Sequence, residues 1–298
     1  MTLRKHILSL LFFAPGLLLP ASAQEDNDEV GIWSELGVEK AITKKWDVGL
    51  DLEYRAQDRA RFSAGLGTSY KLNKYLKFGV SYNFLYSQRP DKYKDKSEGE
   101  VGSENWTTGY NYTSEYWFPR HRFSAEATGS IKLWKWLKVS LRERYQLTQS
   151  RARSVDKLKH RVETIKIYDF DDDWNEITWY EENDPTDEIE TEIKPAYTDQ
   201  VLRSRLKLEM DKKRNPFSPF VSAEFHNSVG VGDHMLLQKI RTAAGVSYKF
   251  RKHNEVSLSY VLTFDMYDTE EDETTMTLQT VRLHDRMHAI NIGYKYSF

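Results

Sequence analysis

The sequence contains no cysteine among its 298 residues, which excludes disulfide bonds, thiol catalysis and thiolate metal sites. It also lacks an excess of basic charge, because 43 Lys and Arg residues stand against 45 Asp and Glu residues. A basic nucleic-acid-binding protein is therefore excluded. Gly-rich phosphate loops, metal-spaced histidine clusters and nucleophile elbows are missing as well, so we expect no metal and no cofactor.

Long apolar runs are also missing, except for one at the N-terminus. A basic head at residues 4–6 and an apolar run at residues 7–19 precede a small-x-small cleavage pattern before Gln24. This is the pattern of a secretory signal peptide. A helix of about 13 residues spans only about 20 Å, against about 30 Å of membrane hydrocarbon. We therefore expect a cleaved signal peptide at residues 1–23 and one mature domain at residues 24–298.

What the mature chain does have is alternation of apolar and polar residues along its length. In the last nine residues, apolar side chains stand at even positions from Ile290 to Phe298, with small or polar ones between them. This pattern is typical of strands with one apolar face. Further runs lie near residues 31–42, 46–55, 61–72, 76–86, 123–132, 137–148, 202–210, 218–228, 236–250 and 255–267.

We predict an all-β fold, a transmembrane antiparallel up-and-down β-barrel. The runs of roughly 10 to 13 residues suit a tilted crossing of an apolar band about 25 Å tall, whereas strands of soluble proteins average about 5 to 6 residues. Aromatic residues gather at the run ends, where membrane interfaces lie. We assign short lysine-bearing turns to the periplasm, and long loops near residues 88–118 and 150–199 to the cell exterior.

The number of strands is a difficulty for this prediction. Counting back from Phe298 gives eleven runs, whereas bacterial single-chain barrels almost always have an even number of strands. We therefore expect about 12 strands, within a range of 10–12. Either one strand is split or missed, or the run at residues 31–42 is not an ordinary wall strand.

The terminal strand also predicts where the protein resides. A secreted chain that closes on Tyr294, Tyr296 and Phe298 resembles bacterial outer-membrane barrels, whose assembly machinery recognises a terminal aromatic strand. This resemblance implies integral insertion into the outer membrane. It also implies the barrel-assembly machinery, outer-membrane lipid and lipopolysaccharide as partners. The sequence leaves the oligomeric state open.

Charges of both signs occupy the luminal parity of the predicted strands. Because each bare buried charge costs several kcal/mol, we expect them to pair in a network that fills the lumen. The alternative is a selectivity ring around a small pore, which would favour anions if the basic runs are neighbours. Glu35, Asp51 and Asp265 share this parity. The predicted network comprises Glu53, Glu126, Arg142, Arg144, Arg203, Arg205, Lys207, Glu209, Glu224 and Arg241.

One pair of residues offers an alternative function. His226 and Ser228 have the spacing at which an imidazole activates a hydroxyl on the same strand face, as in outer-membrane lipid hydrolases. Their parity places them in the lumen instead of toward lipid, and no acid partner is evident. A satisfied luminal histidine is the competing interpretation.

Two further features depart from the simple pattern. Glu143 has the lipid-facing parity of a regular strand, so we expect a β-bulge that turns it inward, with a protomer contact or local protonation as the alternatives. The segment 169–192 carries twelve Asp or Glu residues and no Lys or Arg. It is either a solvated loop or a weak divalent-cation site, although its calcium-loop spacing fails at Trp174. The alternating residues 164–168 and 176–180 on either side of the acidic residues 171–173 predict a hairpin.

Four segments resemble an established family. Residues 36–40, 44–46, 49–55 and 69–77 read LGVEK, KKW, GLDLEYR and SYKLNKYLK. They are similar to an uncharacterised family of Gram-negative outer-membrane β-barrels, filed as a domain of unknown function. The resemblance implies fold and location but no activity. We therefore expect a narrow channel or a structural or surface-interaction barrel with a charge-filled lumen, and an outer-membrane lipid-modifying hydrolase is the alternative.

Overall fold

The computed structural model describes residues 28–298 except 104, 171–173, 175, 212–214, 231–234, 252 and 272–277. The expected signal peptide lies outside these residues. Within them, no helix is long and apolar enough to cross a membrane. The strands are β1 (Asp28–Ala41), β2 (Trp46–Ala56), β3 (Arg61–Lys71), β4 (Leu76–Arg89), β5 (Lys92–Asp95), β6 (Asn105–Thr113), β7 (Tyr116–Lys132), β8 (Leu137–Ser150), β9 (Arg153–Phe170), β10 (Glu176–Lys194), β11 (Tyr197–Met210), β12 (Phe217–Ser228), β13 (Leu236–Phe250), β14 (Asn254–Glu271) and β15 (Leu278–Ser297).

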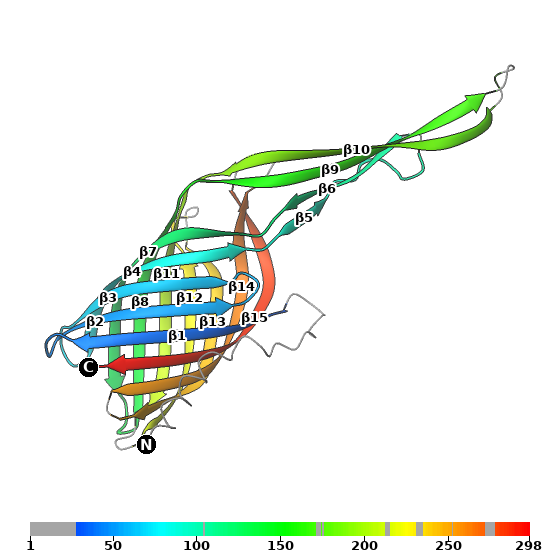
Figure 1. Cartoon of the computed structure of the whole chain (residues 1–298). Helices are drawn as coiled ribbons and strands as arrows, with labels where there is room; N and C mark the ends of the chain where they lie inside the picture. The colour runs from blue at the N-terminus through cyan, green and yellow to red at the C-terminus, as the bar shows by residue number, and fades with distance from the viewer. Residues whose placement is uncertain are drawn as a thin grey trace, which may run out of the picture. The chain divides into compact units, whose positions relative to one another are not determined.

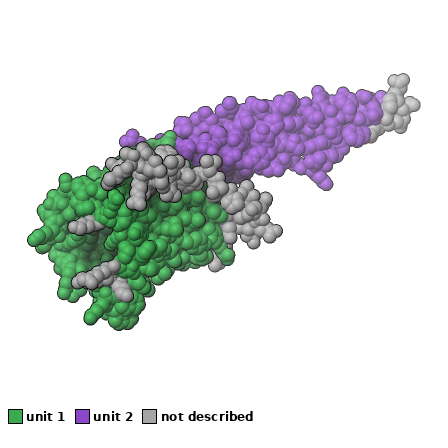
Figure 2. Space-filling view, turned by 60° about the horizontal axis from the view of Figure 1, so that its bottom comes forward, with its two compact units in different colours: residues 1–87, 119–150, 198–298 green, residues 88–118, 151–197 purple. Residues whose placement is uncertain are grey.

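The chain forms two compact units. Residues 1–87, 119–150 and 198–298 make up the first unit, and residues 88–118 and 151–197 make up the second (Figure 2). The long connections predicted from the sequence at residues 88–118 and 150–199 therefore correspond closely to the second unit.

The first unit is a closed β-barrel (Figure 1). Its eleven described strands follow the order β1-β15-β14-β13-β12-β11-β8-β7-β4-β3-β2 around the wall. The all-β barrel prediction and its range of 10–12 strands are confirmed. Because β7 lies beside β4 and β11 lies beside β8, the two insertions leave and rejoin the wall without interrupting it.

The odd strand number is accommodated at one parallel pair. When neighbouring strands alternate in direction, closure of an odd number brings two strands of like direction together. β1 pairs in parallel with β15, from Asp28 opposite Arg286 to Glu39 opposite Ser297, and antiparallel with β2. Phe298 extends this seam, since its N–H donates to the Glu39 carbonyl at 3.0 Å. No twelfth strand is required, and the run at 31–42 is a wall strand.

Along the wall strands, apolar side chains on the outer face alternate with polar side chains on the inner face. Outward-facing apolar residues are exposed, among them Leu50, Leu66 (57 %) and Val80, whereas inward-facing Ser63 and Ser87 are buried. This organisation is the reverse of that of a soluble protein and is typical of a transmembrane barrel. Rings at the strand ends are also exposed, as the girdle prediction requires, namely Trp46, Tyr75, Trp134, Trp136 and Phe298 near one end and Tyr54, Tyr86 and Tyr145 near the other.

Side-chain oxygens close the tight turns at one end of the barrel. Thr43 Oγ1 accepts hydrogen bonds from the backbone N–H groups of Lys45 and Trp46, at 3.2 and 3.0 Å. Asn73 Oδ1 accepts from the two residues at the equivalent positions of the next turn. Beside a third turn, the Lys132 ammonium donates to Asp211 and lowers the pKa of that carboxyl. These local bonds fix which strands become neighbours.

The second unit is a four-stranded antiparallel sheet in the order β10-β9-β6-β5. The predicted hairpin at 164–168 and 176–180 is confirmed and is longer than expected. β9 and β10 pair from Arg153 opposite Lys194 to Phe170 opposite Glu176. Most of the acidic segment is therefore strand β10. The Asp171–Asp173 run of the calcium-like spacing lies outside the described residues.

The bulge expected at Glu143 is wrong. β7 and β8 pair without a register shift, and Glu143 lies opposite Ala127 on the outward parity. Its carboxylate accepts a hydrogen bond from Ser204 Oγ of the neighbouring β11 at 2.6 Å. A hydroxyl from another strand therefore stabilises the charge in place of a local change in backbone.

Replacing this outward carboxylate is expected to stabilise the barrel. Glu143→Leu should raise the free energy of unfolding in lipid vesicles by about 1 kcal/mol, since an acid on the lipid face costs less than the 2–4 kcal/mol of a basic residue. Ser204→Ala should lower it, because the carboxylate then loses its donor. Urea titration monitored by tryptophan fluorescence measures both. A loss of stability in Glu143→Leu would contradict this account.

The parallel seam predicts a specific cross-link in a chain that has no native cysteine. Ser34 and Ile292 are partners in the register, and paired strands lie about 4.8 Å apart, within disulfide range. Ser34→Cys with Ile292→Cys should oxidise within one chain. Ser34→Cys with His288→Cys, shifted by about 13 Å along the strand, should not. Cross-linking of only the shifted pair would exclude the parallel register.

Candidate functional site in the barrel interior

Glu224 is the centre of the interior charge network. This β12 carboxylate is 4 % exposed. It accepts hydrogen bonds from Arg142 Nη2 of β8 at 2.9 Å, from the Arg203 guanidinium of β11 and from His226 Nε2 at 2.9 Å. Arg241 Nη1 of β13 lies 4.0 Å away. One carboxylate thus joins side chains from four strands, and the bond to β8 reaches beyond the strands adjacent to β12.

The network continues from Arg203 toward β7 through neutral groups. Arg203 Nη1 donates to Gln146 Oε1 at 3.2 Å, and Gln146 Nε2 donates to Ser124 Oγ at 3.3 Å. Both neutral side chains are buried. Hydrogen bonds therefore run around the wall from β12 to β7.

A second carboxylate lies on β2. Glu53 accepts from Arg55 at 2.9 and 2.8 Å and from Arg61 at 2.6 Å. The Arg55 guanidinium also stacks 3.8 Å from the Trp33 ring centre, and Arg241 approaches the same ring at 4.9 Å. Trp33 is 3 % exposed, and its ring is approached by guanidinium groups from β2 and β13. These contacts extend across the interior, because β1, β15 and β14 separate the two arginine strands in the wall.

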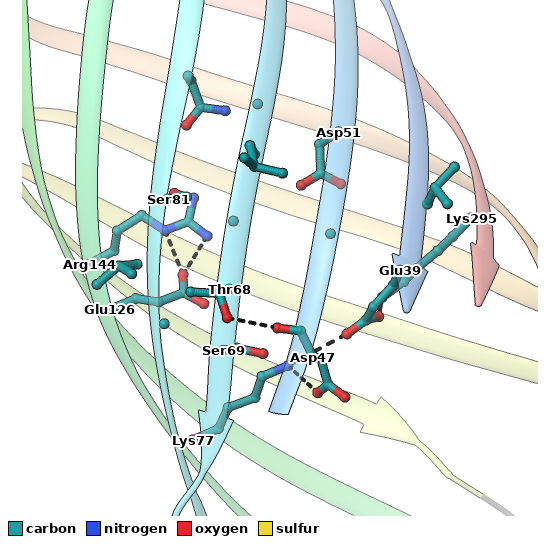
Figure 3. Close-up of a pocket in the computed structure, with 18 residues that line it drawn as sticks. Glu39, Asp47, Asp51, Thr68, Ser69, Lys77, Ser81, Glu126, Arg144 and Lys295 are labelled. Carbon is teal, nitrogen blue, oxygen red and sulfur yellow. Dashed lines mark hydrogen bonds and ion pairs between the residues drawn. The ribbon is translucent and has the colours of Figure 1, made fainter. Parts of the chain in front are cut away.

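A cavity of about 270 Å³ lies beside a third ion pair (Figure 3). Arg144 Nε donates to Glu126 Oε2 at 2.7 Å at one margin of the cavity. Glycines on β2, β3 and β4 form part of the wall and leave the space open, since a Cβ at Gly79 would lie 3.1 Å from the Glu126 side chain. The other charged lining residues are Glu39, Asp47, Asp51, Lys77 and Lys295.

The structure does not bring all the residues of the predicted network together. Lys207 and Glu209 form a separate pair at 3.1 Å on β11. Arg205 makes no ion pair within the described residues, and its buried Nε has no hydrogen-bond partner there. The other network residues belong to the groups around Glu224, Glu53 and Glu126.

Sequence reasoning missed several interior basic residues. Arg55 and Arg61 follow the same parity rule on β2 and β3 and could have been found by extending it. Arg120 and Arg122 precede the predicted run at 123–132, but β7 begins at Tyr116 and includes them. The polar stretch at 119–122 shows no apolar alternation, which hid the start of this strand.

The His226 and Ser228 pair has no hydrolase geometry. The His226 imidazole bonds to Glu224, and no hydrogen bond joins it to Ser228 among the described residues. Ser228 is 1 % exposed, and the exposed side chain next to His226 on the outward face is Phe225. The described residues also contain no group of three or more His, Asp or Glu side chains able to hold a metal ion.

The terminal aromatic residues contact neighbouring strands at the end of β15. Tyr294 Oη donates to Asn254 Oδ1 at 2.6 Å, and the rings of Tyr296 and Phe298 lie 5.6 Å apart. Lys40 lies 5.2 Å from the Phe298 ring centre. Their recognition by an assembly machinery stays a prediction.

Comparisons with known proteins show the family. No curated protein matches the sequence. A solved structure, the CymD monoaromatic hydrocarbon channel, is similar with a TM-score of 0.35 and 9 % identity, over 80 % of this chain and 83 % of that chain. The model of a family described as protein of unknown function (DUF2490) matches residues 30–274. The resemblance to an uncharacterised barrel family is thus confirmed, and the chain belongs to the DUF2490 family.

Proposed function

We propose that the protein is an integral outer-membrane barrel that forms a narrow, anion-selective passage. The apolar exterior, the exposed aromatic rings at both ends and the secretory pattern of residues 1–23 support the location. The tight turns then face the periplasm, and outer-membrane lipid and lipopolysaccharide surround the wall. We assign residues 88–118 and 151–197, which form the second unit, to the cell exterior.

The positive excess of the interior carries the functional part of this proposal. Glu224 alone is shared by Arg142, Arg203 and, at 4.0 Å, Arg241. Glu53 is shared in the same way by Arg55 and Arg61. Because several guanidinium groups share each of these two carboxylates, we propose that this part of the interior retains positive charge, which attracts small anions and repels cations.

The same contacts restrict the size of a permeating solute. Side chains from β8, β11 and β13 converge on Glu224, and two guanidinium groups approach the buried Trp33 ring. We therefore propose a passage for small hydrated ions and not for large solutes. A barrel closed completely by this network, with a structural or surface-interaction role, is the competing outcome of the test.

Planar-bilayer recording measures both conduction and selectivity. Folded protein, identified by a gel position that changes on boiling, should give steady single-channel steps. Its reversal potential in a potassium chloride gradient should have the sign of anion preference. Arg203→Gln should weaken this preference because one interior positive charge is lost. Arg286→Gln, on the outward parity of β15, is the matched control and should leave it unchanged.

Two results would contradict the proposal. Silence from folded, inserted protein would indicate a closed structural barrel. Cation preference in the unmodified protein would show that interior guanidinium groups do not set selectivity.

For the hydrolase alternative, lipid release that persists in Ser228→Ala would remove His226 and Ser228 from consideration.

A further inference from the structure

Arg122 is an interior guanidinium with no carboxylate partner among the described residues. Its Nε donates to Thr148 Oγ1 at 3.0 Å, and Thr148 is 2 % exposed. In the part of the chain that the structure describes, this neutral hydroxyl is its only hydrogen-bond partner. A charged group in such surroundings requires compensation that Thr148 does not supply.

The charged groups around Arg122 make its position more unfavourable. The guanidinium groups of Arg61, Arg203, Arg120 and Arg55 lie close enough to repel it. We call these five residues the arginine cluster. Every charge that dominates the electrostatic surroundings of Arg122 within the described residues is therefore positive.

The carboxylates near the cluster are already committed to other guanidinium groups. Both oxygens of Glu53 accept hydrogen bonds from Arg55, and one also accepts from Arg61. Glu224 Oε1 bonds to Arg203 and His226, while its Oε2 bonds to Arg142. All four carboxylate oxygens therefore already accept from other side chains, and neither acid bonds to Arg122 among the described residues.

The register brings the arginine cluster onto one arc of the wall. Arg55 lies directly opposite Arg61, and Arg61 lies opposite Ser87. Ser87 Oγ accepts a hydrogen bond from Arg120 at 2.7 Å. Arg122 lies opposite Thr148 on β8, beside the strand that carries Arg203. The five guanidinium groups therefore come from β2, β3, β7 and β11, within one run of six neighbouring wall strands, and share the inward parity.

At least one donor in the arginine cluster has no acceptor. The Nε of Arg61 is buried and has no hydrogen-bond partner in the described part of the chain. Guanidinium N–H groups match the oxygens of phosphate through paired hydrogen bonds. A tetrahedral oxyanion has several oxygen atoms that accept hydrogen bonds from donors in different directions. Chloride is a single atom and cannot form paired hydrogen bonds with a guanidinium group.

We propose that the arginine cluster binds a multivalent tetrahedral oxyanion, phosphate or a phosphate ester, with Arg122 as its central ligand. The bound anion neutralises Arg122 and accepts from donors that the protein leaves unused. This goes beyond the proposed passage, because binding at the cluster does not require conduction through the barrel.

Isothermal titration of the folded mature barrel in non-ionic detergent at low ionic strength tests the proposal. Inorganic phosphate and glycerol 3-phosphate serve as probes, and succinate serves as an anion of different geometry. Saturable binding of a phosphate probe, with weaker binding of succinate, is expected. Arg122→Gln should lower phosphate affinity by about tenfold or more. Lys138→Gln removes an interior-parity charge near the turn end of β8 and should not change it.

Thermal unfolding separates a lost site from a lost fold. Arg122→Gln should unfold at a higher temperature than the unmodified protein without phosphate, because the repulsion is relieved. Phosphate should then raise the unfolding temperature of the unmodified protein and not that of the variant. Absence of saturable phosphate binding in the unmodified barrel would overturn the proposal, as would equal binding by Arg122→Gln. Succinate binding as tight as phosphate binding would overturn the tetrahedral assignment.

The binding and conduction results remain distinguishable. A silent barrel that binds phosphate through Arg122 would overturn the passage and retain the site. A conducting barrel with no phosphate binding would overturn the site and retain the passage.

Discussion

The Glu224 carboxylate is the interaction on which the interior of this barrel depends. Guanidinium groups from β8 and β11 and an imidazole from β12 donate to it, with Arg241 of β13 nearby. These charged side chains are largely buried, so the shared acid lowers the free-energy cost of burying them. Removal of the Glu224 carboxylate would leave the guanidinium groups around it to repel one another. The same sharing leaves Arg122 without a carboxylate partner among the described residues.

Closure of the wall sets the positions of these charges. An odd number of strands requires one parallel seam, which β1 and β15 form with Phe298 bonded to Glu39. Closure also joins β4 to β7 and β8 to β11 across the insertions that lead to the second unit. Arg142 on β8 reaches Glu224 on β12 because β11 follows β8 directly in the wall.

Much of the barrel could be predicted from the sequence because alternation assigns each side chain to a face. The parity of Arg142, Arg203 and Glu224 was evident before their contacts were known. Partners across the wall were not, because strand order is a long-range property. Glu143 shows the limit, since its donor Ser204 lies 61 residues away along the chain. Arg122 was missed for a local reason, because the polar stretch at 119–122 hid the start of β7.

A double-mutant cycle tests the central claim that Glu224 compensates the interior guanidinium groups. The free energy of unfolding would be measured for the unmodified barrel, Glu224→Gln, Arg203→Gln and the double variant in lipid vesicles. Glu224→Gln alone should lower the free energy of unfolding by about 3–5 kcal/mol. The coupling energy between the two residues should be about 1–3 kcal/mol. A coupling energy near zero would contradict the account, because the two side chains would then contribute independently.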